Sequence, residues 1–277
     1  MHRPLKDIDI EGSGCIDFIS DLHLQPSEMA SFDAWSRYMH TTPASSLFIL
    51  GDFFEVWAGD DFLESEYADF ENRCIRVLND ASKRMAIFFM AGNRDFLLKD
   101  KALDAANMKA LEDPCILRAQ GAQFVLSHGD AMCLSDVDYL KFRHMVGDEG
   151  WQTQFLAKPL QERLAIARAM RVKSEEEKAK YRKAFETAKS TNVENSNSEN
   201  TLMGLHDVDT EFANSTLESL HCNTLIHGHT HRPGEYPLLG ENRRIVLSDW
   251  DALSQPARLE VLRLKDGHLF RHNLAAH

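Results

Sequence analysis

Three alternating histidines, His227, His229 and His231, stand in the segment LIHGHTHRP near the C-terminal end of the chain. They follow the apolar residues 225–226, which we expect to end a strand. Alternate residues of a strand point to the same side, so the sequence predicts all three imidazoles on one face. Gly228 has no side chain, so a ligand or metal ion can approach the backbone there. We interpret these histidines as metal ligands, with His227 as the one that could instead be structural.

Polar side chains also follow four other apolar runs, which we expect to be buried strands. The runs and the residues after them are 15–20 with Asp21 and His23, 47–50 with Gly51 and Asp52, 86–91 with Gly92 to Asp95, and 123–126 with His128. In open α/β sheets, sites form beyond the carboxyl ends of the strands. The sequence therefore predicts that these side chains meet the histidines at one site.

The predicted ligands are carboxylate and amide oxygens together with imidazoles, and no thiolate takes part. This set suits Mn²⁺, Fe²⁺ or Zn²⁺. It is too large for one tetrahedral ion and fits two ions that share a carboxylate, an arrangement that clamps a displacement at phosphorus. Two divalent ions outweigh the charges of Asp21 and Asp52, so the site would attract a pyrophosphate. Taken singly, Asp21 could cap a helix, Asn93 could stabilise a turn and His128 could be structural.

Length and composition narrow the class of protein. The 277 residues can form one large domain or a domain with an insert. The net charge of −12 argues against nucleic acid as a partner. The five cysteines are scattered without a C-x-x-C pair, which indicates a reducing compartment and neither disulfides nor a thiolate zinc site. Since no signal peptide or membrane-spanning run is evident, we expect a cytoplasmic protein that does not cross a membrane.

Apolar strands separated by helices, expected at 28–40 and 66–83, indicate an α/β fold with a sheet buried on both faces. The pair Asp266-Gly267 between two strand-like segments predicts a hairpin, and hence antiparallel members of the sheet. We expect a flexible N-terminal arm over residues 1–14. Residues 15–135 and 206–277 would form the core, and residues 136–205 a helical cap insert with a polar loop near 191–200.

The insert has a stripe of apolar residues at helical spacing, with basic residues on its polar side. The stripe consists of Trp151, Phe155, Leu156, Leu160 and Leu164. Further on, Ser174 begins a capping box of the type S-E-E-E. Such an amphipathic, basic surface suits acyl chains and anionic lipid. The alternative is an ordinary solvated pair of helices.

As an ordered set, the blocks in residues 15–135 and 220–252 resemble the calcineurin-like metallophosphoesterase superfamily. The resemblance implies a sandwich of mixed β-sheets flanked by helices. Four segments resemble a narrower family, the UDP-2,3-diacylglucosamine pyrophosphohydrolases of lipid A biosynthesis: GDFFEVW from Gly51, GNRDFL from Gly92, HGD from His128 and HGHTHRP from His227. The superfamily usually has histidine at position 94, whereas the narrower family has arginine, as this chain does.

The resemblance also implies a set of functional residues. Two Mn²⁺ ions per chain would be held, one by Asp21, His23, Asp52 and His231, and the other by Asp52 as the bridge with Asn93, His128 and His229. Catalysis would involve Asp52, Asn93 and Arg94, and substrate contacts would come from Asn93, Arg94, Asp136, Ser174 and His229. The chain is longer than the family between Ser174 and Asp207, and a lysine and an asparagine that the family uses there have no assigned counterpart. Arg94 has the alternative of a surface ion pair.

The implied reaction is hydrolysis of the pyrophosphate bond of UDP-2,3-diacylglucosamine by a two-metal-activated water, which gives 2,3-diacylglucosamine 1-phosphate and UMP. The resemblance places this reaction peripherally on the cytoplasmic face of the bacterial inner membrane, with no protein partner implied. One alternative is a metallophosphoesterase for a soluble nucleotide, either a dinucleoside polyphosphate or a cyclic nucleotide, which would not need a basic amphipathic insert. Another is a binding module that has kept the fold and lost catalysis. The complete ligand set counts against that alternative.

Overall fold

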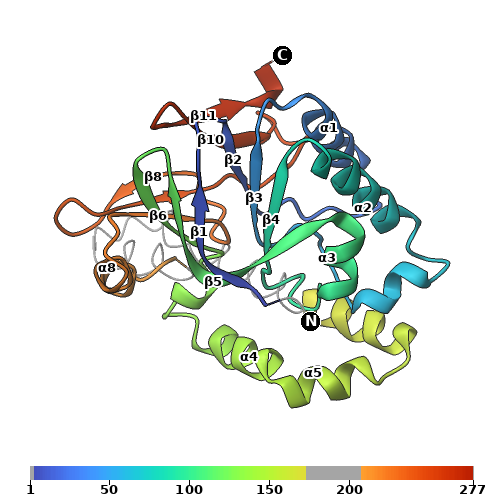
Figure 1. Ribbon diagram of the computed structural model, residues 1–277. Coiled ribbons are helices and arrows are strands. Elements are labelled where there is room, and N and C mark those ends of the chain that lie inside the picture. The colour runs from blue at the N-terminus through green and yellow to red at the C-terminus, as the bar shows by residue number, and fades with distance from the viewer. Residues whose placement is uncertain (1–2, 173–206, 277) are drawn as a thin grey trace. The chain divides into compact units, whose positions relative to one another are not determined.

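The computed structural model describes residues 3–172 and 207–276, which belong to two compact units (Figure 1). Unit 1 comprises Met1–Asp130 and Thr210–His277, and unit 2 comprises Ala131–Asp209. Unit 2 includes the region where the sequence predicts the insert at 136–205. Ser174, the capping box that begins there and the predicted polar loop lie outside the described residues.

The described part of unit 1 contains an eleven-stranded mixed sheet in the order β11-β10-β2-β3-β4-β5-β6-β7-β9-β8, with β1 beside β5. The strands are β1 Leu5–Ile10, β2 Ile16–Ile19, β3 Ser46–Leu50, β4 Ala86–Met90, β5 Met108–Ala119, β6 Ala122–Ser127, β7 Thr224–His227, β8 Gly234–Pro237, β9 Arg243–Val246, β10 Glu260–Lys265 and β11 His268–Asn273. The set β2, β3 and β4 is parallel, and so is the set β6, β7 and β9. The predicted mixed α/β fold is confirmed, and so is the hairpin between β10 and β11.

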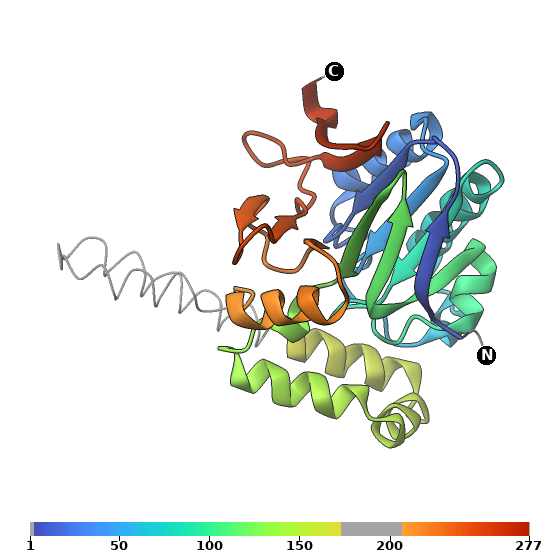
Figure 2. The same ribbon diagram turned by 60° about the vertical axis from the view of Figure 1, so that its left-hand side comes forward.

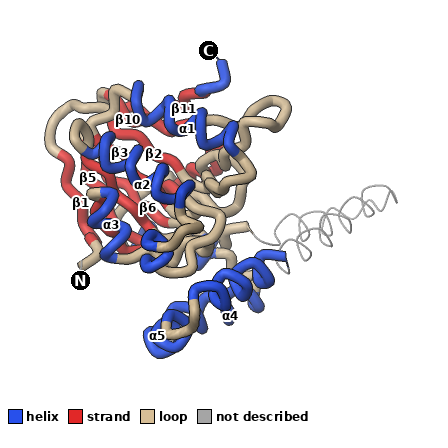
Figure 3. The backbone as a smooth tube through the Cα atoms, turned by 90° about the vertical axis from the view of Figure 1, so that its right-hand side faces the viewer, coloured by secondary structure: helices blue, strands red, loops and turns tan. Residues whose placement is uncertain are grey.

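Helices cover one face of β2, β3 and β4 (Figure 3). They are α1 Met29–Thr41, α2 Asp69–Ser82 and α3 Asp100–Ala106; α8 Thr210–Ser219 precedes β7, and short 3₁₀ turns occur at Asp60–Glu64, Asp130–Met132 and Leu274–Ala276. In α2 the buried residues include Phe70, Cys74, Leu78 and Ala81. Their spacing of three or four residues places them on one side of the helix, which therefore turns an apolar face to the sheet.

The core lies between two parts of the sheet, which β5 joins. The first residues of β5, Met108 to Ala110, pair with β4, whereas its last five, from Cys115 to Ala119, pair with β6. On the first part, Phe18, Phe48 and Phe88 are register partners and stack, with ring centroids 5.4 Å and 4.6 Å apart. They share one buried cluster with apolar residues of the second part, such as Leu126 and Ile226. The two parts thus form the layers of a sandwich.

Residues 5–10 are not the flexible arm that we expected. They form β1, which lies parallel to β5 (Figure 2). Ile8 is buried, with 5% of its surface exposed, and Asp7 forms a 2.9 Å ion pair with Arg118 of β5. The second half of β5 would otherwise be an edge with unpaired backbone groups, and β1 covers it.

A buried ionic network holds α1 to the sheet. Asp17 of β2 is fully buried and lies opposite Arg263 of β10, which donates to its two oxygens at 2.6 and 2.8 Å. Tyr38 and Thr42, at the end of α1, donate to the same carboxylate at 2.7 and 2.8 Å. Since a buried charge is tolerated only when it is paired and hydrogen-bonded, this carboxylate fixes the position of the C-terminal end of α1.

Unit 2 is helical in its described part, with α4 Val137–Gly147, α5 Glu149–Leu156 and a helix over residues 160–172. Asp136 and Asp148 cap α4 and α5, each accepting from a backbone N–H three residues on. Within the predicted apolar stripe, Phe155 and Leu164 are buried, and Leu156 is 38% exposed. The stripe is therefore partly used for packing. No helix in the described ranges 3–172 and 207–276 is long and apolar enough to cross a membrane.

Glu71, in the first turn of α2, is a buried carboxyl group in unit 1. Only 7% of its surface is exposed, and its Oε2 accepts no hydrogen bond from the described residues. Burial raises the pKa of Glu71 above its ordinary value of 4.5. The folded state therefore holds this proton to a higher pH than the unfolded state does, and the carboxyl destabilises the fold as the pH rises above about 4.5.

We predict that Glu71→Gln stabilises the protein relative to wild type, with a difference that grows from pH 5 to pH 8. Urea unfolding across this range measures it. Glu11→Gln, at an exposed position, is the control and should leave the wild-type profile unchanged. An equal difference at both pH values would contradict the assignment of the penalty to the Glu71 charge.

Candidate metal centre

Two groups of three possible metal ligands form among the described residues of unit 1. The first cluster is Asp21, His23 and His231, and the second cluster is Asp52, His128 and His229. Within each, one ligand atom from every residue lies within 4.8 Å of the others. Asn93 adjoins the second cluster, with its Oδ1 3.1 Å from His128 Nε2 and 3.1 Å from His229 Nδ1. The structure thus brings together all the predicted metal ligands.

Asp52 lies between the two clusters. Its Oδ2 is 3.9 Å from His23 Nε2 of the first cluster, and its Oδ1 is 3.7 Å from His128 Nε2 of the second. The side chain is buried, and the backbone N–H of Arg94 donates to Oδ1 at 2.9 Å. Each oxygen therefore faces a different cluster, as a shared carboxylate requires.

The prediction that the three histidines lie on one face of a strand is wrong. β7 ends at His227, and His229 and His231 have left-handed backbones with φ of 67° and 51°. The chain turns after the strand, so His229 joins the second cluster and His231 the first. His227 is fully buried, with its Nδ1 2.9 Å from the carbonyl oxygen of Gly228, and belongs to neither cluster.

Three other predicted ligands also have left-handed backbones: φ is 54° at Asp21, 47° at His23 and 53° at Asp52. Such a conformation costs about 1–3 kcal/mol at a residue with a side chain, so the surroundings must impose it. Here the pairing of β2 with β3 continues into the loops. Asp21 N donates to Gly51 O at 3.1 Å, and His23 N donates to Asp52 O at 3.0 Å.

Two glycines leave room for the carboxylates. A Cβ at Gly228 would lie 2.3 Å from Asp21 Oδ2, and a Cβ at Gly92 would lie 2.2 Å from Asp52 Oδ1. Both contacts are far below van der Waals distance. Gly228 was expected to admit a ligand or metal ion, but in the structure it admits the side chain of Asp21, whose Oδ2 accepts from the backbone N–H of His229 at 2.9 Å.

An oxygen lies behind three of the imidazoles, on the side away from the clusters. The Nδ1 of His128 is 2.9 Å from Leu50 O, and the Nδ1 of His23 is 2.9 Å from Glu55 Oε2. The Nδ1 of His231 lies 3.7 Å from Asp249, whose two carboxylate oxygens each accept from Arg258 at 3.0 Å. When Nδ1 carries the proton toward such an acceptor, Nε2 is left with its lone pair facing the cluster.

The sequence analysis missed Glu55 and Asp249, and it included Asp95 at the predicted site without giving it a role. Asp95 is fully buried and accepts from the backbone N–H groups of Phe53 at 2.7 Å, Phe54 at 3.3 Å and Gly92 at 2.8 Å. It thereby ties the loop after β3 to the loop after β4. Burial and the nearby charge of Asp52 raise the pKa of Asp95 to about 7. Glu55 and Asp95 stand inside the motifs GDFFEVW and GNRDFL, so their position was the available signal.

The residues present fit divalent cations. Asp21 Oδ1 is buried, accepts no hydrogen bond from the described residues, and lies 3.3 Å from His231 Nε2, which is itself 3.2 Å from His23 Nε2. In the second cluster, burial lowers the pKa of His128, but the charge of Asp52 outweighs this effect and the pKa rises to about 9. Burial and the neighbouring His128 both lower the pKa of His229, which falls to about 3. Converging lone pairs of oxygen and nitrogen are satisfied together by a bound cation and not by one another.

The predicted substrate residues have different outcomes. The side chain of Arg94 is 11% exposed, and its Nη1 lies 3.9 Å from Glu55 Oε1. Arg94 therefore forms an ion pair, but this pair is largely buried and is not the surface ion pair considered as the alternative. Asp136 belongs to unit 2 and is the N-cap of α4. Ser174 lies outside the described residues. Asn93 and His229 stand at the second cluster as given above.

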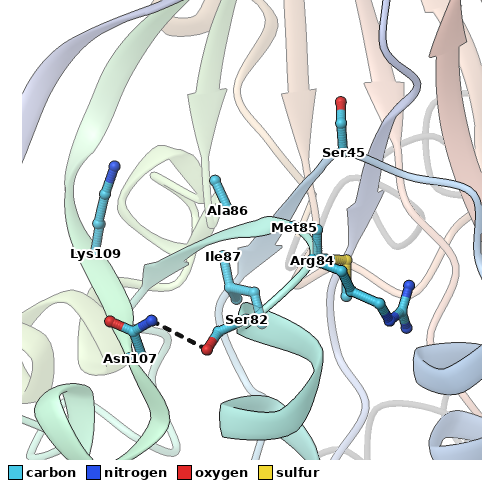
Figure 4. A pocket seen from close by; sticks show the side chains of 8 residues that line it. All are labelled: Ser45, Ser82, Arg84, Met85, Ala86, Ile87, Asn107 and Lys109. Atoms are coloured by element: carbon cyan, nitrogen blue, oxygen red, sulfur yellow. Dashed lines mark hydrogen bonds between the residues drawn. The ribbon is translucent and has the colours of Figure 1, made fainter.

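A cavity of about 380 Å³ lies elsewhere on unit 1, at the amino-terminal ends of β3 and β4 (Figure 4). Its lining consists of Ser45, Ser82, Arg84, Met85, Ala86, Ile87, Asn107 and Lys109. Asn107 donates to Ser82 there at 3.0 Å. None of the predicted site residues lines this cavity, and the ligand clusters lie beyond the opposite, carboxyl ends of the same strands.

Comparison with known proteins agrees with this geometry. The family model of the calcineurin-like phosphoesterases matches residues 16–233. A protein of Ralstonia nicotianae named UDP-2,3-diacylglucosamine hydrolase is 39% identical over 93% of this chain and 91% of its own length. A protein of the same name from Stenotrophomonas maltophilia is 39% identical over 84% of this chain and 90% of its own length. Another, from Chromohalobacter salexigens, is 36% identical over 90% of this chain and 92% of its own length.

We predict that Asp52→Ala releases divalent metal from both clusters, because each loses an anionic ligand that it shares with the other. Elemental analysis after gel filtration measures the metal bound per chain. Asp33→Ala, an exposed carboxylate of α1, should keep the wild-type content. Full metal content in Asp52→Ala would show that Asp52 is not the shared ligand.

Proposed function

The chain belongs to the calcineurin-like phosphoesterase family and, within it, to the UDP-2,3-diacylglucosamine hydrolases, and from this premise we propose how it works. It hydrolyses UDP-2,3-diacylglucosamine, a step of lipid A biosynthesis. The bond broken is the pyrophosphate bond, and the products are 2,3-diacylglucosamine 1-phosphate and UMP. The family uses divalent metal ions, and we assign two Mn²⁺ ions to each chain.

One observation carries the proposed number of two ions: the position of Asp52 between the two clusters, with one oxygen toward each. Asp21, His23 and His231 would hold one ion, and Asn93, His128 and His229 the other. Divalent ions held there polarise phosphoryl oxygens and lower the pKa of water to near neutrality. The carboxylates of Asp21 and Asp52 do not offset the whole charge of two such ions, so the site attracts the anionic diphosphate.

Arg94 would act on the phosphoryl group. Its backbone is fixed by two hydrogen bonds, from its N–H to Asp52 Oδ1 and to its carbonyl oxygen from the N–H of Trp57. The guanidinium carries a fixed charge and donors in a planar fork, which match the oxygens of a phosphate. With the backbone of Arg94 fixed before the substrate arrives, the guanidinium would stabilise the negative charge that develops as the bond to the leaving phosphate breaks.

The insert would serve the acylated half of the substrate. Large apolar side chains in the described part of unit 2 are exposed, including Val137 at 55%, Met145 at 42% and Val172 at 58%. Each methylene group removed from water contributes about 0.8 kcal/mol, so two acyl chains can supply much of the binding free energy. Because such chains reside in lipid, we place the enzyme peripherally on the cytoplasmic face of the bacterial inner membrane. Asp136 and Ser174 remain proposed substrate contacts.

We predict that Arg94→Ala lowers kcat by about 100-fold or more, because the variant loses an electrostatic donor. The metal content should stay at the wild-type level, because the variant keeps every metal ligand. Steady-state kinetics with UDP-2,3-diacylglucosamine and elemental analysis measure the two quantities. Arg94→Lys keeps the charge and loses the planar fork, so it should recover part of kcat. A normal kcat with a raised KM would assign Arg94 to ground-state binding instead.

The substrate class is tested by comparing UDP-2,3-diacylglucosamine with UDP-glucosamine, which lacks both acyl chains. We predict that the wild-type enzyme strongly prefers the acylated substrate in kcat/KM. In the variant with Val137→Ser and Met145→Ser, kcat/KM for the acylated substrate should fall about tenfold, because two apolar contacts worth about 0.8 kcal/mol per methylene are removed.

Turnover of UDP-glucosamine by this double variant should not change, and flotation with anionic vesicles should weaken. Leu239→Ser, at a 60% exposed position of unit 1, is the matched control and should behave as wild type. If both substrates are turned over equally by wild type, or fall equally in the variant, the insert is ordinary structure. The alternative of a soluble nucleotide substrate would then be favoured.

A further inference from the structure

We propose that Glu55 is a positioning residue that controls the affinity of the first cluster for its ion without being a ligand itself. The inference rests on the proposed function only for the presence of two ions. Glu55 is buried, with 7% of its surface exposed, and follows Asp52 by three residues in the loop after β3. Its two carboxylate oxygens face two different groups of the site.

The first oxygen faces a ligand. Glu55 Oε2 lies 2.9 Å from His23 Nδ1, a close contact between a carboxylate and the imidazole, whereas His23 Nε2 faces the carboxylates of Asp21 and Asp52 at 3.9 Å each. The imidazole therefore stands between Glu55 on one side and the first cluster on the other. A carboxylate this close to Nδ1 favours a proton on that nitrogen, which leaves the lone pair on Nε2 and makes Nε2 a stronger ligand.

The second oxygen faces the phosphoryl side of the site. Glu55 Oε1 is 3.9 Å from Arg94 Nη1. The backbone of Glu55 is fixed as well, because its N–H donates to Leu24 O at 3.2 Å, next in sequence to His23. One buried carboxylate thus lies against a metal ligand and faces the guanidinium that would contact the substrate.

The second cluster has a different support. The Nδ1 of His128 is 2.9 Å from the backbone carbonyl oxygen of Leu50, which is uncharged and is not removed by any side-chain substitution. A change at Glu55 therefore acts on the imidazole of one cluster and leaves the support of His128 in place. This asymmetry predicts that the two ions respond differently to the same substitution.

The test is a Mn²⁺ titration in competition with a chelator, carried out on the whole protein. Wild type should bind two ions. Glu55→Ala should weaken one of them by about 10- to 100-fold and leave the affinity of the other unchanged. Glu55→Gln, which keeps an acceptor oxygen and loses the charge, should have an intermediate effect.

Glu71→Gln is the matched control, since Glu71 is equally buried at 7% exposed and belongs to neither cluster, and both affinities should remain as in wild type. A double-mutant cycle separates positioning from general structure. Because Glu55 acts through the imidazole of His23, Glu55→Ala should cause no further loss of affinity in a His23→Ala background.

Two ions bound by Glu55→Ala with wild-type affinities would overturn the inference and leave the proposed function in place. Equal weakening of both ions, or a further loss in the His23→Ala background, would also overturn it, because Glu55 would then support the site as a whole. Fewer than two ions in wild type would instead refute the two-ion assignment, and the inference with it.

Discussion

The site depends on parallel strand pairing that continues past the ends of the strands. Backbone hydrogen bonds from Asp21 to Gly51 and from His23 to Asp52 extend the ladder of β2 and β3 into the loops. Beyond the second parallel set, Gly228 N donates to His128 O at 3.0 Å in the same way. These bonds hold the backbone in left-handed conformations that its side chains disfavour. Without them, the loops would relax and the ligands would turn away from one another.

The sequence was sufficient to find the ligands because each follows a continuous apolar run, and such runs end at a common edge in an α/β sheet. It was not sufficient to assign the histidines to their clusters. The side chains alternate as in a strand only as far as His227, because the backbone is left-handed at His229 and His231. Tertiary hydrogen bonds impose this conformation, and the residue types do not signal it. Glu55 was missed for a related reason: its role depends on its distance to His23, which neither residue reveals alone.

In the fold as well, the sequence predicts what depends on composition and does not predict what depends on tertiary contacts. Strands with uninterrupted apolar residues, such as β3 and β4, were predicted almost to the residue, because burial on both faces requires that composition. β1 has the sequence LKDIDI, in which half of the residues are charged, and it is a strand because it pairs with β5. In the insert, helical spacing predicted the helices. It did not distinguish buried Leu164 from exposed Leu156, because that depends on the packing of one helix against the next.

The ligands of the first cluster are far apart in the chain: His23 and His231 are separated by 208 positions. During synthesis the ribosome produces the first members of both clusters early and the last histidines late. A nascent chain that ends before β7 has neither complete set, however well its first strands have folded. The complete ligand sets therefore come together only after β7 and the loop that follows it have been made, and metal ions bound there would stabilise only chains folded at least to that extent, since binding free energy is gained by the folded state alone.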